Sequence, residues 1–161
     1  METIQPKTRR AVLRIAEWQE GVVEMPSGSN KVKYNDAYYG GTVSGKAYAW
    51  CMVFVWWVFR EAGFNLWKTA SCTAFVNRYR VYAPKQIVTG NFRPGDIVFF
   101  DFSGGRKKTE HTGIVLEVNG STVTTIEGNT GTGNDANGGA VMRRTRRVGL
   151  VTCAIRPGYP D

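Results

Sequence analysis

The chain has 161 residues, of which 42% are hydrophobic and 21% are charged, and its formal net charge is +8. This length is enough for one domain with a sizeable core, and the composition excludes a disordered or fibrous protein. The excess of positive charge indicates an acidic partner, which could be nucleic acid, an anionic membrane surface or a wall rich in teichoic acid.

The first predicted element is an amphipathic helix over residues 8–20, in which Val12, Ile15 and Ala16 face inward. Residues 24–45 follow, and they are rich in glycine, serine, asparagine and tyrosine. We expect them to form a long irregular loop, and loops of this length in a compact domain are usually functional or disordered. The tyrosines favour an ordered loop that lines a groove.

A second helix is predicted over residues 47–63, at the centre of the expected fold. From Met52 to Phe59 the side chains are apolar on every side, which is typical of a buried helix. The run is far shorter than the roughly 20 residues of a membrane span. Cys51 lies at the start of this run, where the positive end of the helix dipole favours the thiolate. A small buried core cysteine is the alternative interpretation.

A third helix is predicted over residues 69–82, capped by Thr69 or Ser71 and ended by Pro84, and Cys72 is interpreted as a packing residue within it. The second half of the chain has the short apolar runs and the glycine-bearing turns of an antiparallel sheet. The predicted strands cover residues 97–102, 111–118, 121–127, 140–145 and 150–155. Helices followed by strands favour an α+β fold, in a single domain over residues 1–161.

The cysteines narrow the chemistry that the chain can carry. Cys51, Cys72 and Cys153 are odd in number and widely spaced, so we expect no disulfide framework. A zinc site would need all three together with His111, without any pair spaced C-x-x-C, and we do not favour it. We expect no secretion signal and therefore a reducing cytoplasm, because residues 1–10 are polar and basic and no apolar run follows them.

His111 is the single histidine of the chain, so any catalytic pair of cysteine and histidine must use it. It opens a predicted strand, from which its imidazole can project toward the start of the central helix. Glu127 and Asn129 lie two residues apart on the neighbouring strand and share a face, so they are candidates to orient the imidazole. An incidental surface histidine is the alternative interpretation.

Two registers of the hairpin that joins these strands stay open. With a two-residue turn at 119–120, Val118 lies opposite Ser121 and His111 opposite Gly128. With a three-residue loop and a glycine bulge, His111 lies opposite Glu127. A catalytic role favours the second register, and the apolar pattern does not decide between them.

Five short segments carry a resemblance to a known family. They are YNDAYYG at 34–40, AWC at 49–51, RPGDIVFF at 93–100, HTGIV at 111–115 and EGNT at 127–130. In this order and spacing they resemble the CHAP domain, the cysteine, histidine-dependent amidohydrolase/peptidase. This is a papain-like family of peptidoglycan hydrolases that is common in phage endolysins. The resemblance covers nearly the whole chain and depends on the ordered set, because no single motif is specific.

The resemblance implies a papain-like α+β fold, with N-terminal helices packed on a C-terminal antiparallel sheet. It implies that Cys51 is the nucleophile and that His111 is the general base and then the acid. Glu127 and Asn129 would hold and polarise the imidazole. The implied reaction is hydrolysis of a peptidoglycan amide bond, either between N-acetylmuramic acid and L-alanine or within the stem or cross-bridge peptide.

Aromatic side chains near the cysteine are candidates for the substrate groove. Tyr39, Tyr48 and Trp50 are the residues we expect to bind substrate, with Trp67 as a further candidate, although Tyr39 and Trp50 are equally compatible with a core position. The expected partner is bacterial peptidoglycan, with no nucleic acid and no membrane span, and the expected state is a monomer.

Some members of the family carry a calcium site just upstream of the cysteine, built from closely spaced aspartates. Only Asn35 and Asp36 stand there in this chain, so we expect no cofactor, and bound calcium is the less favoured alternative. The basic sets at 106–108 and 143–147 are candidates to grip anionic wall polymers such as teichoic acids, and a solvated face is the alternative for both.

No wall-binding repeat follows the segments of the resemblance, so we expect either an excised domain or a protein that binds walls through its own charge. A wall hydrolase without a secretion signal must wait in the host cytoplasm for a holin-type membrane pore before it reaches the wall, which suits a phage lysis protein. The rival interpretations are a basic non-enzymatic module that binds wall polymer or nucleic acid, and a papain-like peptidase or transferase that acts on protein.

Overall fold

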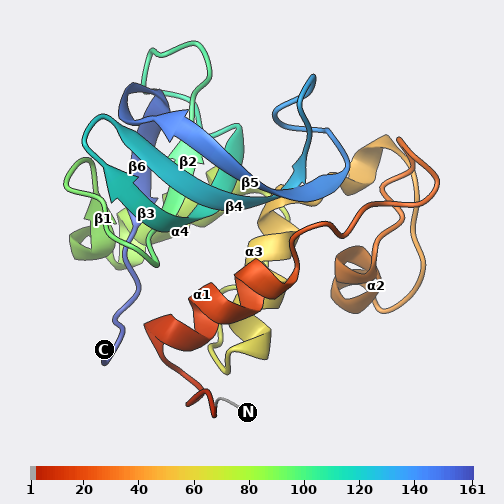
Figure 1. Cartoon of the computed structure of the whole chain (residues 1–161), viewed down its shortest axis with the longest axis horizontal. Coiled ribbons are helices and arrows are strands. Elements are labelled where there is room, and N and C mark those ends of the chain that lie inside the picture. The colour runs from red at the N-terminus through yellow and green to blue at the C-terminus, as the bar shows by residue number, and fades with distance from the viewer. Residues whose placement is uncertain (1–2) are drawn as a thin grey trace.

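The computed structural model describes residues 3–161, and its helices lie in the first half of the chain (Figure 1). The α-helices are α1 (Arg9–Trp18), α2 (Lys33–Tyr39), α3 (Cys51–Glu61) and α4 (Cys72–Tyr82). Short 3₁₀ turns are η1 (Lys46–Tyr48), η2 (Pro84–Gln86) and η3 (Val148–Leu150). The three predicted helices are confirmed, and each begins one to four residues later than expected. α1 and α3 also end two residues earlier than expected, whereas α4 ends at the predicted residue.

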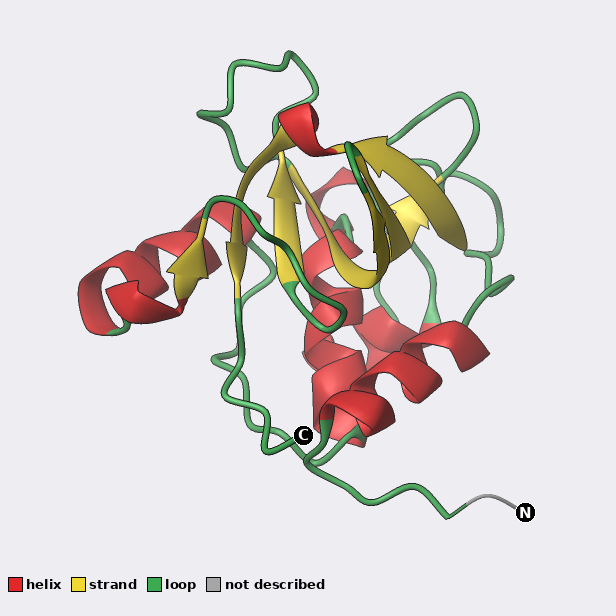
Figure 2. Cartoon of the chain, turned by 60° about the vertical axis from the view of Figure 1, so that its left-hand side comes forward, coloured by secondary structure: helices red, strands yellow, loops and turns green. Residues whose placement is uncertain are grey.

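The second half of the chain forms a sheet in which each pair of neighbouring strands is antiparallel, with the strand order β1-β6-β2-β3-β4-β5. Figure 2 shows the strands as a twisted sheet with the helices packed below and beside it. The strands are β1 (Ile87–Val88), β2 (Ile97–Phe100), β3 (His111–Asn119), β4 (Thr122–Thr130), β5 (Ala140–Arg147) and β6 (Val151–Ile155). The predicted α+β fold is therefore confirmed, and β1 is the strand that the sequence did not predict.

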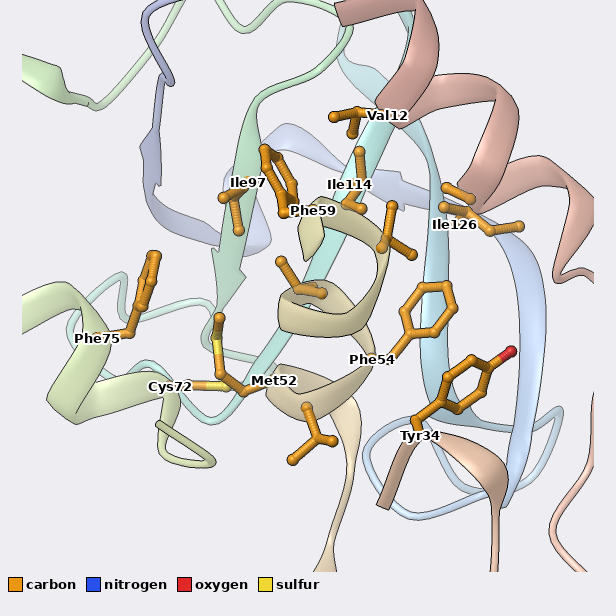
Figure 3. Close-up of a cluster of buried hydrophobic side chains, with 14 of the residues drawn as sticks. Val12, Tyr34, Met52, Phe54, Phe59, Cys72, Phe75, Ile97, Ile114 and Ile126 are labelled. Atoms are coloured by element: carbon orange, nitrogen blue, oxygen red, sulfur yellow. The ribbon is translucent and has the colours of Figure 1, made fainter. Parts of the chain in front are cut away.

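The core is built around α3, as the apolar run predicts. Met52, Phe54 and Phe59 are fully buried and point toward residues of the sheet and of the other helices (Figure 3). At Gly128, on β4, an added Cβ would lie 2.5 Å from Cβ of Phe54. Only glycine allows this approach of β4 to α3, because such a distance is far below van der Waals contact.

The segment predicted as a long loop contains a helix, and that prediction is wrong over residues 33–39. α2 is short and has no long apolar period, so the sequence pattern could not reveal it. Its Tyr34 is fully buried, and the ring lies 5.5 Å from Trp50 and 5.1 Å from Phe54, between ring centroids. Tertiary burial of this ring therefore holds a helix that local propensity alone does not indicate.

The hairpin between β3 and β4 has neither expected register. Val118 pairs with Val123 rather than with Ser121, so the turn lies further along the chain than either interpretation placed it. A bulge between Val115 and Glu117 then shifts the pairing within the strand itself. Period-2 alternation cannot locate a bulge of this kind, because the shift changes which residues share a face.

Asp161 lies against the start of α1. Thr8 caps the helix by accepting a hydrogen bond from the backbone N–H of Ala11 at 3.1 Å. Asp161 accepts two more, from the backbone N–H groups of Arg9 at 2.6 Å and Arg10 at 3.2 Å. A carboxylate at this end of α1 also complements the positive end of the helix dipole.

Candidate active site

Cys51 is the first residue of α3 and its side chain is partly exposed. The backbone N–H groups of the first helical turn have no partner within the helix and lie beside this sulfur. Together with the helix dipole, they favour negative charge at the position that Cys51 occupies. The local structure is therefore the one expected for an activated thiol.

A second thiol lies against the first. The Cys51 and Cys72 sulfur atoms are 3.7 Å apart, a hydrogen-bonding distance for two sulfur atoms. Cys72 is the first residue of α4 and is buried, and Figure 3 shows it pointing toward the first turn of α3. The interpretation of Cys72 as a packing residue is correct for its burial but misses this contact, because sequence spacing does not show which helix ends meet.

His111 lies at the start of β3, and a neighbouring carboxylate holds one of its two ring nitrogens. Its Nε2 is 2.8 Å from Oε1 of Glu127, and both side chains are fully buried. An ionised carboxylate only accepts hydrogen bonds, so Nε2 carries a proton in both charge states of the ring. Nδ1 has no hydrogen-bond partner among residues 3–161, so it is the ring nitrogen that is open to a further contact.

The contact between His111 and Glu127 is diagonal across the two strands. A Cβ added at Gly113 would lie 2.6 Å from Cγ of Glu127, so β3 passes directly over Glu127 two residues after His111. Side chains two residues apart on a strand share a face, which brings the imidazole and the carboxylate together. The predicted neighbours therefore meet although neither predicted register is present.

The charges of Cys51, His111 and Glu127 depend on one another. The hydrogen bond with Cys72 is the largest influence on the pKa of Cys51. With His111 and the Met52 backbone N–H, it outweighs burial and holds that pKa well below its ordinary value. Burial alone would lower the pKa of His111, but Cys51 and Glu127 outweigh it and raise that pKa to about 9. A thiolate and an imidazolium are therefore the favoured pair near neutral pH.

Glu127 stays ionised in a buried position because of its partners. Burial raises the pKa of a carboxyl group, but hydrogen bonds with His111 and Arg146 lower the pKa of Glu127 to about 2. Arg146 donates from Nη2 to Oε1 at 2.6 Å and from Nε to Oε2 at 3.0 Å. Thr125 donates from its hydroxyl to Oε2 at 2.5 Å. These hydrogen bonds fix the orientation of the Glu127 carboxylate and hold its Oε1 against the imidazole.

Arg146 was not predicted as part of this site. It belongs to the basic set at 143–147, which we expected to bind wall polymer or to form a solvated face, and for Arg146 both interpretations are wrong. Its side chain is only 6% exposed, and it also donates to Asp135 at 2.6 Å. Successive side chains of β5 point to opposite faces of the sheet, so Arg144 and Arg146 lie on the other face from the exposed Arg143 and Arg147. The sequence does not say which of the two faces is turned inward.

Asn129 is buried beside the site but serves a different contact. Its Oδ1 accepts from the backbone N–H of Gly139 at 3.1 Å, and its Nδ2 donates to Asn137 at 3.4 Å. Among the described residues no hydrogen bond joins it to His111. In this structure Asn129 therefore holds the loop between β4 and β5, and a role in polarising the imidazole stays a prediction.

The three aromatic candidates for the substrate groove separate into two kinds. Trp50 is fully buried, and its Nε1 donates to Glu24 at 3.3 Å, so it is a core residue and the prediction that it binds substrate is wrong. Tyr39 is 37% exposed, and its ring meets that of the partly exposed Tyr48 at 4.9 Å. These two rings remain available to a ligand. A hollow of about 320 Å³ lies nearby, between Lys46, Glu24, Gly28, Asn30 and Asn137.

The other basic set, at 106–108, has a structural part and a solvated part. Asp101 accepts backbone hydrogen bonds from Lys107 and Lys108, both at 3.1 Å, while the lysine side chains are exposed. Arg106 donates to the carbonyl groups of Val151 and Thr89. The two lysines are thus the part of this set that can meet a polyanion.

Asn35, one of the two residues considered above as calcium ligands, connects neighbouring segments of the chain by hydrogen bonds. It is fully buried, and its Nδ2 donates to the carbonyl groups of Asn30 and Tyr48, both at 2.9 Å. Residues 3–161 include no group of three or more His, Cys, Asp or Glu side chains arranged to hold a metal ion. That the protein needs no calcium stays a prediction.

A cysteine at the start of a central helix, beside a histidine that opens a strand of an antiparallel sheet, defines the papain-like α+β class. A family model of the CHAP domain matches residues 43–129, and the chain belongs to this family. The match spans the cysteine, the histidine, the glutamate and the asparagine considered above. In the part of the chain that the structure describes, no helix has the length and apolar character that crossing a membrane would need.

Solved structures of other proteins share the fold. The crystal structure of a wild type endolysin LysIME-EF1 is similar over 96% of this chain and 66% of its own, with a TM-score of 0.62 and 15% identity. Ly7917 is similar over 93% of this chain and 62% of its own, with a TM-score of 0.54 and 19% identity. Ly7917 with the hydrolyzing product of MDP gives a TM-score of 0.52, 18% identity and coverage of 93% and 63%.

The chain spans 62–66% of the length of these solved chains. A comparison with curated proteins found no match.

Proposed function

We propose that this protein is a peptidoglycan hydrolase that cleaves an amide bond with Cys51 as the nucleophile. The observation that carries the proposal is the position of His111. Its Nε2 is bound to Glu127, its Nδ1 has no hydrogen-bond partner among the described residues, and the ring interacts with a thiol at a helix start. A nucleophile, a base and an orienting carboxylate are the parts that covalent amide hydrolysis requires.

The first half of the reaction forms a thioester. The reaction starts from the pair in which Nδ1 of His111 already holds the proton of Cys51, and the thiolate attacks the amide carbonyl carbon. The backbone N–H groups at the start of α3 stabilise the oxyanion, because they are unpaired within the helix and lie beside the sulfur. The imidazolium then donates its Nδ1 proton to the leaving amine, and the carbon–nitrogen bond breaks.

The second half restores the enzyme. His111, now neutral, takes a proton from a water molecule, and the resulting hydroxide attacks the thioester carbon. The carbon–sulfur bond breaks, the carboxylic acid leaves, and the thiolate returns. Glu127 keeps its charge throughout, because Arg146 and Thr125 hold it, and it stabilises each imidazolium that forms.

Peptidoglycan is the proposed substrate because of family membership and two solved structures with the same fold, one of an endolysin and one of Ly7917 with the hydrolyzing product of MDP. The bond is either the one between N-acetylmuramic acid and L-alanine or one within the stem or bridge peptide. Tyr39 and Tyr48 would line the approach to Cys51. The exposed side chains of Lys107 and Lys108 would favour anionic wall polymers, in keeping with the net charge of +8.

We also propose the biological setting. The protein would be a monomeric phage endolysin that needs no metal cofactor, waits in the host cytoplasm for holin-type release, and then causes lysis at the wall. Secretion of the native protein without lysis would contradict this setting.

The test is digestion of purified peptidoglycan followed by mass spectrometry of the fragments. A new N-acetylmuramic acid terminus identifies an amidase, and a freed stem or bridge amine identifies an endopeptidase. Cys51→Ala should release neither, whereas the matched control Cys153→Ala should behave as the unchanged protein, since Cys153 is a core residue of β6. Cleavage of a protein substrate without any wall fragment would refute the proposal.

The second candidate is a non-enzymatic module that binds wall polymer or nucleic acid, and the net charge of +8 is the observation that favours it. Under this alternative, alkylation of Cys51 leaves function intact, and binding weakens steeply with salt. Under the enzymatic proposal, alkylation removes activity while the protein still binds walls. One experiment with alkylated protein therefore separates the two.

A further inference from the structure

The first residues of two helices meet at the candidate active site. Cys51 begins α3 and Cys72 begins α4, and their sulfur atoms lie 3.7 Å apart. Both sulfur atoms are therefore near the positive ends of helix dipoles. Cys51 is partly exposed while Cys72 is buried, so a ligand that reaches the pair meets Cys51.

The start of α4 is held against the strand that carries His111. The hydroxyl groups of Thr73 and Thr109 lie 2.7 Å apart, which joins the residue after Cys72 to a residue two before His111. Ser71 caps the same turn by accepting from the backbone N–H of Ala74 at 3.0 Å. The position of the Cys72 sulfur is thus determined by contacts on both sides of it.

We infer that the Cys72 thiol donates a hydrogen bond to the Cys51 sulfur and stabilises it as a thiolate. Cys72 is then a further functional residue of the site, and it acts through Cys51. This inference adds a residue to the proposed function and rests on the role of Cys51 as the nucleophile.

Three groups face the Cys51 sulfur, and they come from different elements. They are the imidazole of His111 on β3, the backbone N–H of Met52 within α3 and the thiol of Cys72 on α4. His111 must release its proton to the leaving amine, so it cannot remain a donor to sulfur throughout the reaction. Cys72 has no such task and can donate to the sulfur whenever the sulfur is charged.

The direction of the hydrogen bond follows from the surroundings of each thiol. Cys72 is buried and adjacent to Cys51, and these influences raise the pKa of Cys72 well above its ordinary value. The two sulfurs therefore share one negative charge, as two acids in contact do, and one of them keeps its proton. Because His111 interacts with Cys51, the charge resides on Cys51 and the proton on Cys72.

The inference predicts a measurable change in the titration of Cys51. A hydrogen bond to a charged group is stronger than one between neutral groups, so removing the donor should raise the apparent pKa of Cys51 by about one pH unit. Below that pKa, the thiolate fraction and the alkylation rate would fall about tenfold, because the thiolate is the reactive species.

The experiment measures the rate at which iodoacetamide alkylates Cys51 at a series of pH values, with peptide mapping to assign the modified residue. Cys72→Ala should raise the apparent pKa by about one unit, and Cys72→Ser should restore most of the difference, because a hydroxyl also donates. Cys153→Ala is the matched control and should leave the pKa unchanged. Thermal melts confirm that each variant is folded.

A His111→Ala background isolates the effect of Cys72. There the imidazole no longer competes for the sulfur, and adding Cys72→Ala should still raise the pKa of Cys51. If Cys72→Ala leaves the titration of Cys51 within the scatter of the control in both backgrounds, the inference is overturned.

Failure of the inference is distinct from failure of the proposed function, because alkylation requires no substrate. A pKa shift without wall hydrolysis supports the hydrogen bond and contradicts the function. Wall hydrolysis without a pKa shift supports the function and contradicts the hydrogen bond.

Discussion

The two halves of the candidate active site are held in different ways. On the sheet, His111 and Glu127 are fully buried, and Arg146 fixes the carboxylate with two charged hydrogen bonds. At the helix end, Cys51 is partly exposed, and its sulfur lies 3.7 Å from the sulfur of Cys72. The comparison indicates that the half with His111 and Glu127 is rigid, while Cys51, the proposed nucleophile, is open to a ligand. This division suits a thiol that must form and break a covalent bond.

The largest expected effect comes from removing either half. Cys51→Ala and His111→Ala should each lower wall hydrolysis by about 10³-fold or more, and the double variant should lose little beyond either single one, because the two groups act as a unit. The measurement is the initial rate of turbidity loss of purified walls, with thermal melts as a check on folding. Additive losses in the double variant would show that the halves act separately.

Arg146→Met tests the rigidity of the sheet half. It leaves the charge of Glu127 buried with one partner fewer, and breaking a buried ion pair costs about 3–5 kcal/mol. Unfolding in urea should show this loss, and the fold-change in hydrolysis measured well below the melting temperature should exceed the change in substrate affinity.

The matched control for Arg146 is its neighbour Arg147, which is exposed. Arg147→Met should change stability by no more than about 0.5 kcal/mol, as is usual for a surface substitution. Equal losses in the two variants would mean that the contact between Arg146 and Glu127 does not stabilise the fold.

Gly128→Ala tests the packing that brings the two halves together. The new Cβ would meet Phe54, so β4 must move away from α3, and overpacking of this kind costs about 1–3 kcal/mol. Gly90→Ala is the control, because an added Cβ there meets no atom within 4 Å. We expect the melting temperature to fall for the first variant alone. A stable Gly128→Ala protein with full activity would contradict the close packing of β4 on α3.

The last effect is the pH dependence of the contacts that His111 makes with Cys51 and Glu127. The pKa of His111 is raised from 6.5 to about 9, so its contribution to stability is complete below pH 6.5 and is lost as the pH rises through 9. The pKa of Glu127 is lowered from 4.5 to about 2, so its contribution is complete above pH 4.5 and is lost as the pH falls through 2.

The stability difference between the unchanged protein and His111→Gln should therefore be constant between pH 4.5 and 6.5 and should shrink toward pH 9. Urea unfolding at several pH values measures this difference. A difference that does not vary with pH would show that the imidazole carries no charge in the folded protein. Hydrolysis should also decline above pH 9, where His111 can no longer supply a proton to the leaving amine.

Much of the fold was predictable because its signals are local. The apolar run from Met52 to Phe59 predicted a buried helix, and the strands at His111 and Glu127 were predicted from their short apolar runs and turns. α2 was missed because a seven-residue helix held by the burial of Tyr34 has no period of its own. Trp50 was misassigned because an aromatic residue beside a candidate nucleophile has the same sequence signal whether it faces the core or the substrate.

The sequence by itself determined which chemistry the protein can carry: a cysteine at a helix start, a single histidine at a strand start and a glutamate on the next strand. These are features of local order, and short-range patterns record them. Only the tertiary structure decided that Arg146 faces inward to Glu127 and that Cys72 meets Cys51. Each contact joins two consecutive elements, β4 to β5 and α3 to α4, across a connecting loop. Packing rather than sequence spacing sets how these elements meet.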